Sequence, residues 1–149
     1  MLNTYTYPEF EYVQSREQRE GVLARHPVVI IGAGPIGLTA ALDCAFRGIP
    51  AIVLDDNNTV SIGSRAVCYA KRSLEVWDRL GVAAPMVARG ISWKVGKVFF
   101  KEKLAYQFDL LPEEDHKMPA MINLQQYYLE EFNGQASPVK DKAAHVKIA

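Results

Sequence analysis

The sequence from residue 28 to residue 37, Val28-Val-Ile-Ile-Gly-Ala-Gly-Pro-Ile-Gly37, decides the fold. Its four leading β-branched residues are typical of a buried central strand. Pro35 stands where a helix would begin, because the fixed φ of proline suits the first helical turn. The next residues, up to Phe46, are rich in alanine and leucine, and Gly48 lies where a helix C-cap is expected. The stretch therefore predicts a strand, a glycine turn and a helix.

A second apolar run, Ala51-Ile-Val-Leu54, follows this helix and predicts a second strand. Two strands joined by a crossover helix form a βαβ unit with parallel strands. A chain of 149 residues suits one domain of this kind. We therefore predict a fold of the α/β class, with a Rossmann-like βαβ unit and a parallel sheet.

The turn after the first strand matches the pattern G-x-G-x-x-G through Gly32, Gly34 and Gly37. Gly32 allows a sharp turn, Gly34 lets a pyrophosphate approach the backbone, and Gly37 allows close packing of helix on sheet. The helix N-terminus then directs N–H groups and a positive dipole end at the phosphates. Alternatively the turn merely joins strand to helix, but that leaves the three glycines unexplained.

Asp55 ends the second strand and is placed to accept hydrogen bonds from ribose hydroxyls. A carboxylate there also repels the 2′-phosphate of NADP. The fingerprint alone does not distinguish FAD from NAD, since both contain an ADP group. Arg65, in Gly63-Ser-Arg-Ala66, is a candidate to pair with the pyrophosphate, and the alternative is an exposed arginine beside a helix cap.

The rest of the chain predicts further elements around this unit. Ser64 is a plausible N-cap for a helix that ends at Gly81. Lys97–Phe100 and Leu104–Phe108 predict a β-hairpin, and Ile122–Phe132 predicts another helix. The predicted organisation is an N-terminal arm at 1–27, a dinucleotide-binding domain at 28–132, and a tail without regular structure at 133–149.

Composition excludes several classes of function. The 17 basic and 17 acidic residues cancel, so we expect no nucleic-acid partner. The most apolar stretch, 27–42, is too short and broken to span a membrane, and no signal sequence is visible, so we expect no membrane partner and a cytoplasmic location. Two cysteines without Cys-x-x-Cys spacing and three scattered histidines predict no metal site, and both cysteines are predicted to be buried.

Taken together, the sequence resembles the N-terminal part of the FAD-dependent aromatic-ring hydroxylases, which are flavin monooxygenases with the p-hydroxybenzoate hydroxylase fold. Within this family it resembles the 3-(3-hydroxyphenyl)propionate hydroxylase-like enzymes. The segments that carry the resemblance are Val28–Asp55, Gly63–Ala66, Lys71–Gly81, Trp93–Phe100 and Ile122–Phe132.

The resemblance implies FAD as the cofactor and gives a set of cofactor-binding residues. In the family, a glutamine near the FAD is followed three and four residues later by Leu-Glu. Gln126 fits this spacing through Leu129 and Glu130, and Gln125 is the alternative. A polar residue that merely starts a helix is the other interpretation of both. The implied ADP contacts are Gly32, Gly34, Pro35, Ile36, Gly37 and Asp55, with Arg65 on the flavin-nucleotide side.

The resemblance also implies hydroxylation of a small phenolic substrate with NAD(P)H and O₂. The chain departs from the family at Asn133-Gly134, where the family helix continues with an apolar residue. It also lacks the later Gly-Asp segment and the substrate-binding part, so we expect a truncated member that is inactive by itself, with no catalytic residue. The alternatives are an NAD-binding dehydrogenase fragment and a non-catalytic remnant. The sequence does not determine the oligomeric state.

Overall fold

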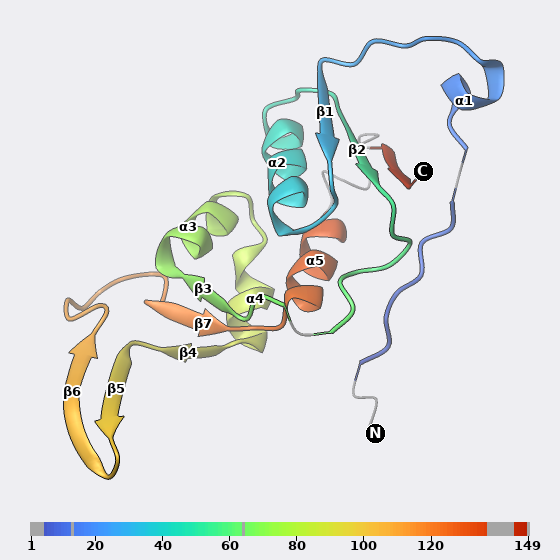
Figure 1. Cartoon of the computed structure of the whole chain (residues 1–149). Coiled ribbons are helices and arrows are strands. Elements are labelled where there is room, and N and C mark those ends of the chain that lie inside the picture. Colours follow the sequence, from blue (N-terminus) through green and yellow to red (C-terminus); the bar gives the residue numbers. More distant parts are fainter. Residues whose placement is uncertain (1–4, 13, 64, 137–144, 149) are drawn as a thin grey trace. The chain divides into compact units, whose positions relative to one another are not determined.

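The computed structural model describes residues 5–12, 14–63, 65–136 and 145–148. Two compact units divide the chain: the first contains the residues up to Arg65 and those from Gln126 onward, and the second is Ala66–Gln125. The predicted domain at 28–132 thus corresponds to parts of both units. The elements, all but the last of them labelled in Figure 1, are α1 (Arg16–Glu20), β1 (Val28–Ile31), α2 (Pro35–Phe46), β2 (Ala51–Asp55), β3 (Cys68–Ala70), α3 (Lys71–Arg79), α4 (Ala83–Arg89), β4 (Ile91–Trp93), β5 (Val95–Phe100), β6 (Lys103–Asp109), β7 (Met121–Asn123), α5 (Gln126–Gly134) and β8 (His145–Ile148).

The first unit contains the predicted βαβ arrangement. Strands β1 and β2 pair in parallel, with Val28 opposite Ala51 and Ile31 opposite Leu54, and α2 connects them (Figure 1). Gly48 has φ 71°, the left-handed conformation expected where the chain leaves α2. The predicted α/β fold with a parallel sheet is confirmed.

The core of this unit lies where α2 meets β2 and α5. Helix α2 contributes Leu42, which is 1% exposed, and Val53 and Leu129 are completely buried. Full burial of each such side chain contributes about 1.5–3 kcal/mol. This packing fixes the start of α2 and the end of β2, which are the two places where the sequence predicts site residues.

The N-terminal arm runs beside the loop that follows β2. The backbone N–H of Phe10 donates to the carbonyl of Asn58 over 2.8 Å, and the hydroxyl of Thr59 donates to the carbonyl of Pro8 over 2.5 Å. The Tyr5 ring lies 4.2 Å from the Tyr127 ring, between centroids. The arm therefore holds both the loop after β2 and helix α5.

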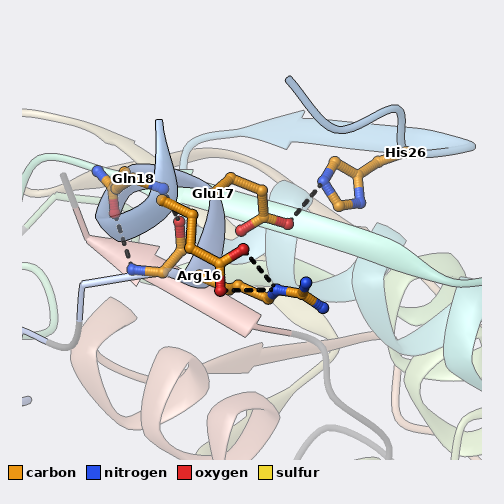
Figure 2. A network of polar contacts seen from close by, with 6 residues as sticks. Arg16, Glu17, Gln18 and His26 are labelled. Atoms are coloured by element: carbon orange, nitrogen blue, oxygen red, sulfur yellow. Dashed lines mark hydrogen bonds and ion pairs between the residues drawn. The ribbon is translucent and has the colours of Figure 1, made fainter. Parts of the chain in front are cut away.

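Helix α1 is short and is stabilised by polar contacts at its ends. The Ser15 side chain accepts from the backbone N–H of Gln18, whose side chain accepts in turn from the Ser15 backbone, so the helix begins with a capping box. Figure 2 shows this network together with the Arg16–Glu20 ion pair at 2.9 Å. The same view shows His26, whose Nε2 lies 3.5 Å from Oε1 of Glu17.

The second unit contains an antiparallel sheet in the order β3-β7-β4 and the separate hairpin β5–β6. The hairpin confirms the sequence prediction. The two predicted helices begin later than expected, because Tyr69 and Ile122 pair in the sheet and leave α3 to start at Lys71 and α5 at Gln126. Ser64, the expected cap, lies outside the described residues.

Two smaller expectations also change. Residues 145–148, predicted to lack regular structure, form β8 in parallel with β2, whose outer edge would otherwise leave backbone groups unpaired. Residues 137–144 of the same predicted tail lie outside the described part.

The expected burial of the cysteines is wrong, since Cys44 is half-buried and Cys68 is exposed. Cys68 donates instead to Oδ1 of Asn123, which fixes it at the sheet edge.

Candidate functional site

The glycine turn joins the end of β1 to the start of α2. Gly32 has φ 100°, a conformation that residues with a side chain rarely adopt, and its N–H donates to the carbonyl of Leu54 over 2.7 Å. Gly34 is the N-cap of α2, with φ −73° and ψ −175°, and Pro35 occupies the first helical position. The chain thus leaves β1, turns back and enters the helix within three residues of backbone.

Helix α2 packs so closely on the turn at Gly32 that position 37 must be glycine. A Cβ added at this position would lie 1.9 Å from the carbonyl oxygen of Gly32 and 3.2 Å from Cγ2 of Ile30. A backbone oxygen at that distance cannot be avoided by rotating a side chain. The third glycine of the motif therefore does what the sequence analysis predicts for it.

The start of α2 presents backbone donors without a side-chain cap. The first hydrogen bond within the helix runs from the N–H of Leu38 to the carbonyl of Gly34, over 2.9 Å. The N–H groups of Ile36 and Gly37 precede it and have no acceptor within the helix, while Pro35 has no N–H. Such donors at the positive end of a helix dipole suit a phosphate group.

Asp55 lies directly against this turn. Its Oδ2 accepts from the backbone N–H of Ala33 over 2.5 Å, and its Oδ1 accepts from the backbone and side chain of Asn57 over 2.8 and 3.1 Å. Burial raises the pKa of Asp55, but the hydrogen bonds from Ala33 and Asn57 outweigh it, so the pKa lies below its usual value. The ionised carboxylate has about four acceptor positions, so it retains capacity for a hydroxyl donor.

Gln126 begins α5 and belongs to a partly buried network. Its Nε2 donates to Oγ of Ser61 over 2.9 Å and to Oε1 of Glu130 over 2.7 Å. A Cβ added at Gly34 would lie 4.0 Å from the same Oε1, so the network lies close to the glycine turn. Gln125, the alternative, is exposed and belongs to the second unit.

Arg65 is not joined to the turn. Its side chain is exposed, and among the described residues it forms no hydrogen bond or ion pair with the turn or with Asp55. Its role towards a pyrophosphate therefore stays a prediction.

Ser61 and Glu130 are the candidates that the sequence analysis does not predict. Glu130 appeared there only as part of the spacing that identifies Gln126. An acidic residue beside Leu129 on the apolar side of a helix is the one signal that could have drawn attention to it. Its partner Ser61 is distant in sequence and carries no motif.

Two other classes of site receive no support from the described part of the chain. In residues 5–136, apart from positions 13 and 64, and in 145–148, no group of His, Cys, Asp or Glu side chains is arranged to hold a metal ion. Within the same residues no helix has both the length and the apolar character needed to cross a bilayer.

Sequence comparison places the chain among flavoproteins. A family model described as "FAD binding domain" matches residues 25–135. A flavin-dependent monooxygenase of Mycobacteroides abscessus is 39% identical over 72 residues, which are 48% of this chain and 15% of that protein. The 6-hydroxy-3-succinoylpyridine 3-monooxygenase HspB of Pseudomonas putida is 33% identical over 104 residues, which are 66% of this chain and 26% of that protein.

Comparison of structures agrees with the sequence. The crystal structure of p-nitrophenol 4-monooxygenase PnpA from Pseudomonas putida matches with a TM-score of 0.64 and 27% identity. The match covers 72% of this chain and 28% of PnpA. The chain therefore spans about a quarter or less of the length of the two curated relatives, and little more of the solved structure.

Proposed function

Since this chain belongs to the family of FAD-binding domains of aromatic-ring flavin monooxygenases, we propose that it holds the ADP half of FAD between the glycine turn and Asp55. FAD, rather than NAD, is the cofactor of this family, as the resemblance implied. The observation that carries the proposal is the contact of Asp55 with Ala33, which brings a carboxylate and a set of backbone donors to one place.

The residues present fit such a cofactor. In the proposal, the N–H groups of Ile36 and Gly37 donate to the pyrophosphate, and the bare backbone of Gly34 lets it approach. Asp55 accepts from the adenosine ribose through its remaining acceptor positions. Gln126 contacts the cofactor from the start of α5, and the exposed Arg65 pairs with its phosphates.

We further propose that the complete enzyme hydroxylates a small aromatic compound, with NAD(P)H as reductant and O₂ as oxidant. Bound FAD supplies the redox chemistry, while this chain binds and orients it. The 149 residues span a small part of the relatives, and none of the site residues is an acid or base for ring chemistry. We therefore expect no consumption of NADH or NADPH when a phenol is added to the FAD-loaded chain.

Titration of the full chain with FAD, followed by flavin fluorescence, tests the binding proposal. We expect Asp55→Ala to weaken FAD binding about tenfold or more, since a hydrogen bond to a charged group contributes about 1.5–3 kcal/mol. Asp56→Ala is the matched control, because Asp56 is the exposed neighbour and should leave the affinity unchanged. Tighter binding of NAD than of FAD, or equal FAD affinity in both variants, would overturn the proposal.

The dehydrogenase alternative has no observation in its favour. Each relative named above is a monooxygenase, and the matching family model describes an FAD-binding domain. The third hypothesis is a remnant that binds no cofactor. It predicts no sign of binding in the flavin fluorescence when the chain is titrated with FAD, so the same experiment tests it.

A further inference from the structure

The N-terminal arm includes residues that precede the part of the chain matched by the family model. That match begins at residue 25, and residues 5–10 lie well before it. Terminal segments are usually poorly ordered unless specific contacts hold them. Residues 5–10 contact two elements of the first unit, so the arm belongs to that unit although it lies outside the matched residues.

On one side the arm pairs with the loop after β2, residues 56–63. The backbone N–H of Phe10 donates to the carbonyl of Asn58 over 2.8 Å. Thr59 lies opposite the arm in an antiparallel bridge, and its hydroxyl donates to the carbonyl of Pro8 over 2.5 Å. The arm therefore holds the loop through backbone groups, in the manner of a short strand.

On the other side the arm packs on α5 through aromatic rings. The Tyr5 ring lies 4.2 Å from the Tyr127 ring and 5.0 Å from the Tyr128 ring, between centroids. The Tyr7 ring lies 5.7 Å from that of Tyr127. Pairs of aromatic rings at these distances attract each other beyond the effect of the area they bury. The Tyr5 hydroxyl also donates to Oε2 of Glu131 over 2.9 Å, so the arm is fastened to the helix by several contacts.

The loop that the arm holds connects two residues of the proposed cofactor site. It begins directly after Asp55, and Arg65 follows shortly after its end. Residues 56–63 are all described, and none of them belongs to a named helix or strand, so the loop depends on contacts with other segments for its shape. Helix α5 supplies one of these contacts, because Oε2 of Glu130 accepts from the backbone N–H of Ser61 over 2.6 Å. The arm supplies the others named above.

We infer that the arm is a strap that positions the loop after β2 for FAD. While the arm is docked, the loop is held in one arrangement, with Asp55 and Arg65 at its two ends. When the arm is released, the loop gains conformational freedom that FAD must remove on binding, so the affinity falls. Linkage then requires FAD to strengthen the docking of the arm by the same factor. The inference rests on the proposed function, because it concerns the same cofactor site.

The FAD affinity of arm variants of the full chain is the first test. Tyr5→Ala removes the ring contacts and the hydroxyl, so we expect it to release the arm and to weaken FAD binding about fivefold or more. Tyr5→Phe keeps the ring and should lie between Tyr5→Ala and wild type. Tyr12→Ala is the matched control, because this tyrosine of the same arm is 49% exposed and donates to Gln18, and it should leave the affinity unchanged. Wild-type affinity in a folded Tyr5→Ala chain would overturn the inference.

Hydrogen exchange at the Phe10 N–H gives a readout that a merely stabilising arm would not change. This proton is bonded to the carbonyl of Asn58, so it exchanges when the arm leaves the loop. We expect saturating FAD to slow its exchange by about the factor by which Tyr5→Ala weakens binding. The Arg19 N–H, bonded to the Ser15 carbonyl in α1, is the reference and should exchange at the same rate with and without FAD. No slowing at Phe10, or equal slowing at both positions, would contradict the coupling.

Thr59→Val keeps the test decisive if Tyr5→Ala does not fold. It removes the hydroxyl that donates to Pro8 and preserves the branched shape of the side chain. We expect FAD binding to weaken about twofold or more and the exchange at Phe10 to become faster, and unchanged values of both would defeat the inference. A wild-type chain that fails to bind FAD defeats the proposed function as well, whereas normal wild-type binding with unaffected arm variants defeats the strap alone.

Discussion

The backbone N–H of Ala33 and the carboxylate of Asp55 lie 2.5 Å apart, which ties the turn after β1 to the end of β2. The contact joins two strand ends that are neighbours in the sheet but are separated in sequence by the whole of α2. It also holds Asp55 in its charged form, because hydrogen bonds from Ala33 and Asn57 outweigh the effect of burial on its pKa. One contact thus serves stability and the proposed ribose site together.

The lowered pKa of Asp55 predicts how stability depends on pH. A group whose pKa is lower in the folded chain stabilises the fold above its unfolded pKa, near 3.8, and this contribution is lost as pH falls through the folded pKa. We expect Asp55→Asn to lower the free energy of unfolding by about 1–3 kcal/mol at pH 7. The difference between wild type and variant should shrink below about pH 4 in urea unfolding.

Asp56→Asn serves as the comparison for that series. Asp56 is exposed, and such substitutions usually change the unfolding free energy by less than about 0.5 kcal/mol. If the difference in unfolding free energy between wild type and Asp55→Asn stays constant from pH 7 down to pH 3, the charge of Asp55 contributes nothing to stability.

Gly37→Ala is expected to destabilise the first unit by about 1–3 kcal/mol or more. The new Cβ would meet the carbonyl oxygen of Gly32, which can move only with the backbone of the turn. Gly96→Ala offers an instructive comparison, since its Cβ would meet the ring of Phe108 at 2.1 Å, and that ring can rotate away. Thermal unfolding should therefore show the larger loss for Gly37→Ala, and a larger loss for Gly96→Ala would refute the argument.

Tyr5→Phe is expected to loosen the N-terminal arm. The Tyr5 hydroxyl donates to Oε2 of Glu131 over 2.9 Å, and burial together with this carboxylate raises the pKa of Tyr5 above its usual value, so it remains a donor at neutral pH. Loss of a hydrogen bond to a charged group should lower the free energy of unfolding by about 1.5–3 kcal/mol. Tyr12→Phe is the control, because that hydroxyl is exposed and donates to the neutral Gln18 side chain. Equal melting temperatures for the two variants would contradict the role of the arm.

The βαβ unit could be predicted because its signals are local. The apolar strands, the glycine spacing and Pro35 all lie within thirty residues or so, and each obeys a steric rule that holds in any protein. The spacing from the glycine motif to the end of the second strand likewise predicted Asp55 as a site residue. The hairpin was likewise predictable, since its two strands are adjacent in sequence.

The parts that were not predicted depend on contacts between distant segments. Strands β3, β4 and β7 have three residues each, which is too few for a periodic pattern. They form strands because Tyr69 of β3 and Ser92 of β4 both pair with Ile122 of β7, the central strand of the sheet. Glu130 is similar, since its burial depends on Ser61, which is remote in sequence. The spacing that identified Gln126 contained Glu130 but gave no reason for an acid there.

Asn133 provides the last prediction, because it stands where the family helix continues with an apolar residue. Its side chain is completely buried, and neither Nδ2 nor Oδ1 has a hydrogen-bond partner among the residues that the structure describes. A buried polar group without a partner costs about 1–3 kcal/mol. Asn133→Leu has the same branching and number of heavy atoms, so it should raise the free energy of unfolding by a similar amount. The melting temperature should rise by about 2–4 °C for each kcal/mol gained. Asn133→Asp places a charge in the same space and should lower the melting temperature. A lower melting temperature for Asn133→Leu would contradict the prediction and mean that the space cannot accept an apolar side chain.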